Sequence, residues 1–164
     1  MPQPPPADEN LSYPIMECTS LLTNSALSTK SKSWTKIGND FHVQIDNAQP
    51  GIYMVDLSFG LVYNSDSEQS VYVRVQVEKS GPASVAGAIR ERHAKSAKRS
   101  GFLRGLFEID SKDTYNFVPQ WMVDGGTGYI EGVPEAGTNL ITNFLTVWQV
   151  GDGGMIVGGS GANS

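Results

Sequence analysis

The stretch DNAQPGIYMVDLSFGLVY, residues 46–63, decides the fold. Pro50-Gly51 is a turn signal, and the residues after it contain no helix breaker except Gly60. Successive side chains of a strand point to opposite faces, so the alternation here predicts one long β-strand. One face would carry Tyr53, Val55, Leu57, Phe59, Leu61 and Tyr63, and the other Ile52, Met54, Asp56, Ser58, Gly60 and Val62. The first set is a core face, whereas the second is too polar for a core, so this strand supports a scaffold rather than a catalytic site.

Further strands follow from the same pattern along the rest of the chain. SVYVRVQVEK, residues 70–79, alternates valines with polar residues and predicts a strand with one buried and one solvent-exposed face. Other strands are predicted at 33–37, 40–45, 102–110, 114–124 and 138–151. Residues 80–101 are rich in Ala and predict a short helix or a long loop, and Pro119 predicts a bulge or an edge position. Regularly spaced strands with Gly, Pro, Asn and Asp turns predict an all-β, two-sheet antiparallel sandwich of jelly-roll type.

The 164 residues correspond to one domain with two tails. We expect an extended N-terminal arm over 1–32, a jelly-roll domain over 33–150 and a glycine-rich C-terminal tail over 151–164. The arm begins with a proline-rich run and continues with apolar residues that are too numerous for a free linker. It therefore either packs as a helix or strand on its own domain or docks on a partner. The docking residues would be Pro4, Pro5, Pro6, Leu11, Tyr13 and Ile15.

The last predicted strand carries apolar groups on both faces. A strand in the outer layer of a sandwich buries only one face within its own subunit, so the second face needs another partner. Subunit packing would provide it, and Ile141, Leu145 and Val147 are the predicted interface residues.

Charge is distributed unevenly along the chain. The net charge is −5, which excludes a general nucleic-acid binder. Residues 90–104 nevertheless contain six basic side chains and one acidic side chain. This run is either a solvated face or a patch for an acidic surface, such as a capsid shell, an anionic host-surface glycan or a neighbouring subunit. The candidate residues are Arg90, Arg92, Lys95, Lys98 and Arg99, together with Arg104.

No pattern for catalysis is present, so we expect a protein that is not an enzyme and has no cofactor. The two histidines, His42 and His93, and the single cysteine have no zinc spacing, and no Gly-x-Ser-x-Gly elbow occurs. Acidic residues in loops suit calcium but are more often simply solvated. The chain shows no signal peptide and no apolar run that would span a membrane, so we expect synthesis in the cytoplasm.

The segment DFHVQIDNAQPGIYMVDLSF resembles the third-strand region of the tumour-necrosis-factor-like and complement globular-head jelly rolls. Phe41, Pro50, Gly51 and Tyr53 match that pattern, and Phe144 in ITNFLTVWQV resembles the centre of the family's closing strand. The resemblance implies a homotrimer packed by a flat apolar wall along a threefold axis. Similar jelly rolls occur in bacteriophage head decorations, head fibres and tail-fibre tips.

Three functions are consistent with these observations. The first is a virion structural protein, a trimeric capsid decoration or head-fibre protein assembled in the host cytoplasm, whose arm binds the major capsid protein or another virion protein. The second is the receptor-binding head of a phage tail fibre, and the third is a soluble cytokine-like or lectin-like module. None of them requires nucleic acid or a membrane.

Overall fold

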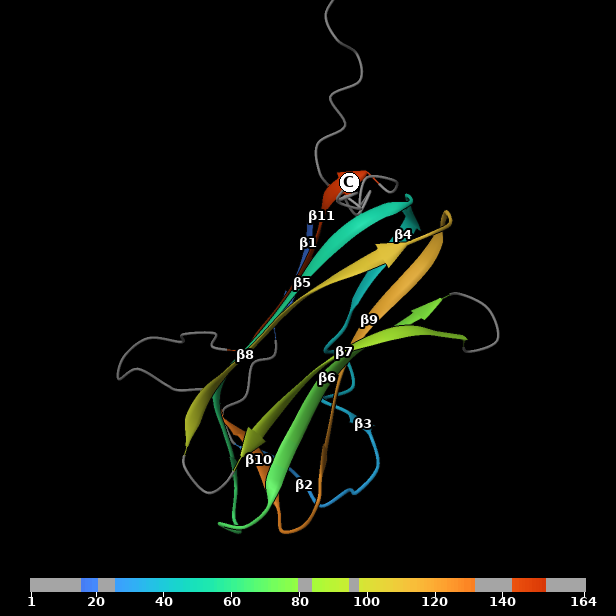
Figure 1. Ribbon diagram of the computed structural model, residues 1–164. Coiled ribbons are helices and arrows are strands. Elements are labelled where there is room, and N and C mark those ends of the chain that lie inside the picture. Colours follow the sequence, from blue (N-terminus) through green and yellow to red (C-terminus); the bar gives the residue numbers. More distant parts are fainter. Residues whose placement is uncertain (1–15, 21–25, 80–83, 95–97, 132–142, 153–164) are drawn as a thin grey trace, which may run out of the picture.

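The computed structural model describes residues 16–20, 26–79, 84–94, 98–131 and 143–152, and these residues form strands and connections without a helix. All strand pairs are antiparallel, and they build two facing sheets (Figure 1). Sheet A contains β1 (Met16–Ser20), β11 (Phe144–Asp152), β5 (Gly51–Asn64), β10 (Gly128–Glu131) and β2 (Leu27–Thr29), in that order, and β8 (Arg99–Ile109) pairs with the other edge of β5. Sheet B contains β3 (Thr35–Lys36), β9 (Asp113–Val123), β6 (Ser70–Lys79) and β7 (Ser84–Ala94), and β4 (Val43–Ala48) also pairs with β9. The predicted jelly-roll sandwich is confirmed.

The core lies between the sheets and is formed by the faces that the alternation predicted. Val71, Val73, Val75 and Val77 of β6 are fully buried. Tyr53 begins the buried face of β5, and its hydroxyl donates to the Gln49 carbonyl oxygen at 3.0 Å. A buried tyrosine usually finds such a partner for its hydroxyl, because an unpaired polar group between two sheets costs stability. Burial raises the pKa of Tyr53, as expected for a phenol held away from water.

The buried face of β5 changes register at Gly60. The pairing with β8 is irregular between Phe59 and Val62, and the Gly60 N–H donates to Oδ1 of the buried Asn143 at 3.1 Å. A bulge shifts the alternation by one residue, so Val62 enters the core beyond it. The prediction that Leu61 and Tyr63 share the core face is therefore wrong, because both side chains are half-buried on the outer face.

The segment predicted as a helix or long loop is instead strand β7. It pairs with β6 from Ser70↔Ala94 to Lys79↔Ser84, with one irregularity between Val77 and Glu78. The Ala-rich composition favoured a helix only by a few tenths of a kcal/mol per residue. A full antiparallel ladder against the long strand β6 outweighs that preference, because pairing depends on the neighbouring strand.

The predicted limit between arm and domain at residue 32 is wrong. β1 pairs with β11 and β2 pairs with β10, so two strands of sheet A lie inside the range 1–32 that the sequence assigned to an arm. At the other end, β11 continues to Asp152, beyond the predicted limit at 150. Residues 1–15, which include all six predicted docking residues, lie outside the described residues.

Pro119 does not mark an edge, because β9 pairs with β6 on one side and with β3 and β4 on the other. It lies between the part of β9 that pairs with β3 and the part that pairs with β4. Its carbonyl accepts from the Ile37 N–H at 3.0 Å. The missing N–H of proline therefore falls at the junction between two short partners, where it interrupts neither ladder.

Candidate interaction surface

The predicted trimer-interface residues of β11 lie inside the subunit. Leu145 stands opposite Leu57 and Val147 opposite Val55, and all four side chains are fully buried in the core. Directly opposite residues of an antiparallel pair share a face, so this register directs Leu145 and Val147 inward. Their assignment to an interface is wrong, and Ile141 lies outside the described residues. The outward set of β11 is Phe144, Thr146 and Trp148.

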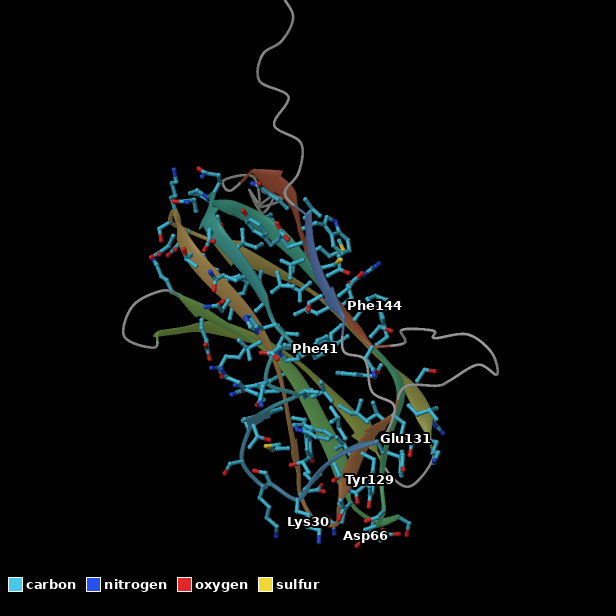
Figure 2. The ribbon with its side chains drawn as sticks, turned by 180° about the vertical axis from the view of Figure 1, so that it is seen from behind. Lys30, Phe41, Asp66, Tyr129, Glu131 and Phe144 are labelled. Carbon is cyan, nitrogen blue, oxygen red and sulfur yellow. The ribbon has the colours of Figure 1, made fainter. Side chains whose placement is uncertain are left out.

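The outer face of sheet A carries most of the exposed large hydrophobic residues that the structure describes. Its exposed large apolar side chains are Phe102 (49%) and Leu106 (58%) of β8 and Phe144 (39%) of β11, and Val150 (44%) is exposed at the bulge of β11 between Gln149 and Gly151. These four are all of the exposed large hydrophobic residues among those that the structure describes. The register aligns Phe144, Ser58 and Phe102 in one row and Trp148, Met54 and Leu106 in another. We call this area, from β11 across β5 to β8, the apolar face; Phe144 marks one side of it in Figure 2.

An ion pair lies at the centre of the apolar face. Arg104 of β8 donates through Nε and Nη2 to the two carboxylate oxygens of Asp56 on β5, at 2.7 and 2.6 Å. The hydrogen bonds to Asp56 raise the pKa of Arg104. Its guanidinium also lies 5.4 Å from the centre of the Phe102 ring. The pair accounts for Asp56, the polar residue that the sequence placed on the non-core side, and it leaves the middle of the face electrically neutral.

A second cluster lies beyond Gly60 on the same side of sheet A. The rings of Tyr63 on β5 and Tyr129 on β10 stack at 4.8 Å between centroids, with an angle of 13° between their planes. Lys98 Nζ lies 4.6 Å from the Tyr63 ring centre and 3.0 Å from Glu131 Oε2. The Tyr63 hydroxyl donates to Glu131, which also lies on β10. We call these four residues the tyrosine stack.

The charges of the tyrosine stack stabilise one another. The hydrogen bond from Tyr63, followed by that from Lys98, lowers the pKa of Glu131. The same bond raises the pKa of Tyr63, and the bond to Glu131 raises the pKa of Lys98. Glu131 is therefore a carboxylate and Lys98 an ammonium at neutral pH, and both already have partners.

The basic run does not form one strand or one sheet. Arg90 and Arg92 lie in β7 of sheet B, at register positions opposite Arg74 and Tyr72. Arg99 begins β8 of sheet A and is exposed. Arg104 and Lys98 are ion-paired, as described above, and Lys95 lies outside the described residues. The binding of an acidic surface by this run stays a prediction.

The structure offers little for metal chemistry in the part of the chain that it describes. No group of three His, Cys, Asp or Glu side chains could hold an ion there. His42 is exposed, as its position in the strand pattern predicted. Cys18, on edge strand β1, is exposed and unpaired. The described residues also include no helix long and apolar enough to cross a membrane.

Sequence reasoning missed Phe102 and Leu106. FLRGLFEI is apolar at both alternations, with Phe102 and Leu106 in one set and Leu103 and Phe107 in the other. The position of Arg104 between Phe102 and Leu106 was the available signal, because an arginine favours the outward set.

Neither a protein-family model nor a curated protein sequence matches this chain. Solved structures do match its fold. Eiger TNF from S. frugiperda aligns over 86% of this chain and 95% of its own, at 10% identity and a TM-score of 0.52. Murine APRIL at pH 8.5 aligns over 84% and 98%, at 11% identity and a TM-score of 0.43. A protein chain in the structure of infectious bursal disease virus, Gx strain, aligns over 82% of this chain but only 36% of its own length, at 9% identity and a TM-score of 0.44.

The chain therefore has a tumour-necrosis-factor-like jelly-roll fold, as its resemblance in sequence implied. A fold does not define a function, so the function has to be argued from the surfaces of this protein.

Proposed function

We propose that this protein is a non-enzymatic structural protein that assembles as a homotrimer through the apolar face. In this proposal the trimer serves a virion as a capsid decoration or head-fibre protein. The single observation that carries the assembly is the concentration of exposed Phe102, Leu106 and Phe144 on one side of one sheet. Contiguous apolar surface of this kind marks an association site on a soluble protein.

The chemistry of the face favours a second copy of the chain as its occupant. Asp56 accepts bonds from Nε and Nη2 of Arg104, which leaves further guanidinium N–H groups for another acceptor. Glu108, two positions beyond Leu106 on the same side of β8, is exposed and makes no ion pair with another described residue. A neighbouring copy can therefore supply both apolar surface and a carboxylate for Arg104. The number of copies, three, is what the sequence resemblance implies.

Mass measurement tests the assembly. The chain has a mass of 17.7 kDa, and light scattering after size exclusion should give about three times that value at micromolar concentration. Leu106→Lys should give the monomer mass, because each interface would then bury an ammonium without a partner. Gln44→Lys is the matched control, since Gln44 is exposed on β4 of the other sheet. A monomeric wild type, or a Leu106→Lys protein that stays assembled, would contradict the proposal.

Attachment to a virion is a separate part of the proposal, and it rests on the sequence resemblance and on the proline-rich residues at the N-terminus. Three anchoring segments in one trimer would bind a capsid far more tightly than one, through effective concentration. The structure sharpens the deletion to residues 2–15, because a longer cut would remove β1 from sheet A. Deletion should abolish binding to purified tail-less capsids while the mass of the trimer is unchanged. Capsid binding that survives the deletion would refute anchoring by this segment.

A further inference from the structure

The apolar face contains adjacent rows of side chains that run across its strands. Neighbouring rows are two residues apart along each strand, a spacing of about 7 Å. The register of β11, β5 and β8 defines three successive rows: Phe144, Ser58 and Phe102; Thr146, Asp56 and Arg104; Trp148, Met54 and Leu106. The first and third rows each contain an aromatic residue on β11 and a large apolar residue on β8, whereas the middle row is polar.

Apolar contact alone does not fix how two copies are aligned across this face. The hydrophobic effect is non-directional and depends on the apolar area that is removed from water. A copy that slides along the strands keeps apolar side chains in contact at several positions, because apolar rows lie on both sides of the middle row. The choice of one alignment therefore depends on the polar row.

Arg104 is the side chain of the middle row that distinguishes one alignment from another. A guanidinium has five N–H groups, and Asp56 accepts from two of them, through Nε and Nη2. No other described residue accepts a hydrogen bond from Arg104, and 55% of its side chain is exposed. The two bonds to the nearly buried carboxylate hold the plane of the guanidinium on the face. In a single subunit the remaining N–H groups are left to water.

Assembly removes that water, so the neighbouring copy has to supply an acceptor. Glu108 lies on the same side of β8, is exposed and makes no ion pair with another described residue. It is about 13 Å along the strand from Arg104, which is too far for an ion pair within one subunit. An alignment that sets the guanidinium against an apolar row leaves a charged donor without an acceptor, which weakens association by on the order of tenfold to a hundredfold.

We propose that Arg104, held in place by Asp56, sets the alignment of the assembled copies by binding Glu108 of the neighbouring copy. This inference rests on the proposed assembly through the apolar face and adds the contact that makes the assembly unique. Polar groups at one point of a packed interface select one register at some cost in stability.

Distances between subunits, measured by double electron–electron resonance, test the alignment. The full-length parent protein carries Cys18→Ser and Ser67→Cys, so that a single nitroxide is attached at the exposed turn between β5 and β6, beyond the end of the apolar face. Copies that are related by cyclic symmetry in one alignment should give one narrow distance distribution.

Two variants of the labelled protein remove the polar selection. Glu108→Leu should weaken association by about tenfold or more and should broaden the distance distribution, because Arg104 loses its acceptor. Adding Asp56→Leu and Arg104→Met should restore association to within about tenfold of the parent, since apolar replacement of an ion pair is often neutral or stabilising. The distance distribution of this triple variant should still contain several populations. Asp40→Leu is the matched control, because it removes an exposed carboxylate from the connection between two strands of sheet B and should leave the narrow distance unchanged.

The outcomes separate this inference from the assembly on which it rests. An assembled parent with a broad distribution, or a narrow distance that is unchanged in Glu108→Leu and in the triple variant, would overturn the role of Arg104 and leave the assembly intact. A monomeric parent, which gives no distance between subunits, would refute the proposed assembly and this inference with it.

Discussion

Two neighbouring residues of β11, Leu145 and Phe144, should respond to truncation in opposite ways. Leu145 is fully buried between the sheets, so Leu145→Ala should lower the free energy of unfolding by about 2–5 kcal/mol. With a urea m-value of about 2 kcal/mol per molar, a loss of about 3 kcal/mol moves the denaturation midpoint down by about 1.5 M. Phe144 is 39% exposed on the apolar face, so Phe144→Ala should cost the isolated subunit only about 1 kcal/mol or less.

The assay has to separate folding from assembly, because association through the folded state raises apparent stability. Urea titration is therefore followed by circular dichroism at a concentration where light scattering shows the monomer. The mass is then measured at higher concentration. We expect Phe144→Ala to weaken assembly while the midpoint of the monomer stays nearly constant. If Leu145→Ala instead kept the wild-type midpoint and lost assembly, the inward register of β11 would be wrong, and with it the location of the interface.

Three further predictions concern the stability of the folded domain. Gly51→Ala should lower the free energy of unfolding by about 1–3 kcal/mol in a denaturant titration. Gly51 has φ +156°, and an added Cβ would lie 2.6 Å from the Gly151 carbonyl oxygen. A variant with the wild-type denaturation midpoint would contradict this prediction. Tyr53→Phe should cost about 0.5–1.5 kcal/mol by removing the bond to Gln49, and an unchanged midpoint would show that bond to be weak. The third is a pH dependence: Glu131 has a lowered pKa, so its stabilisation is present above its ordinary value of 4.5 and is lost as the pH falls through the folded value. The stability gap between wild type and Glu131→Gln should therefore shrink on acidification, and a gap that is constant with pH would refute this contribution.

Sequence patterning identified the fold because the strongest strands follow a clear alternation. SVYVRVQVEK carries valines at every second position, and all four of those valines are buried in β6. The sequence also predicted the turn at Pro50-Gly51 and the position of Tyr53 on the core face. Burial of one face is a local property of a strand, so a local pattern reveals it.

The errors lie where a strand carries apolar residues on both faces or where its partner is distant in sequence. For β11, only the pairing with β5 decides that Leu145 rather than Phe144 points inward. For β7, pairing with β6 overrides an Ala-rich composition. β1 is assigned to the sandwich rather than to an arm by a contact with β11, at the opposite end of the chain.

By itself, the sequence determined an all-β sandwich and the strand β6 with one buried and one polar face. Both follow from the alternation of apolar and polar residues and from the residues at the turns. The tertiary structure alone decided which apolar residues remain exposed and which side chains meet. The shift at Gly60 brings Tyr63 to the surface opposite Tyr129, and the β5–β8 register places Arg104 against Asp56. A one-residue change of register exchanges the two faces of a strand, so the surfaces of this protein are fixed by pairings between distant segments rather than by local composition.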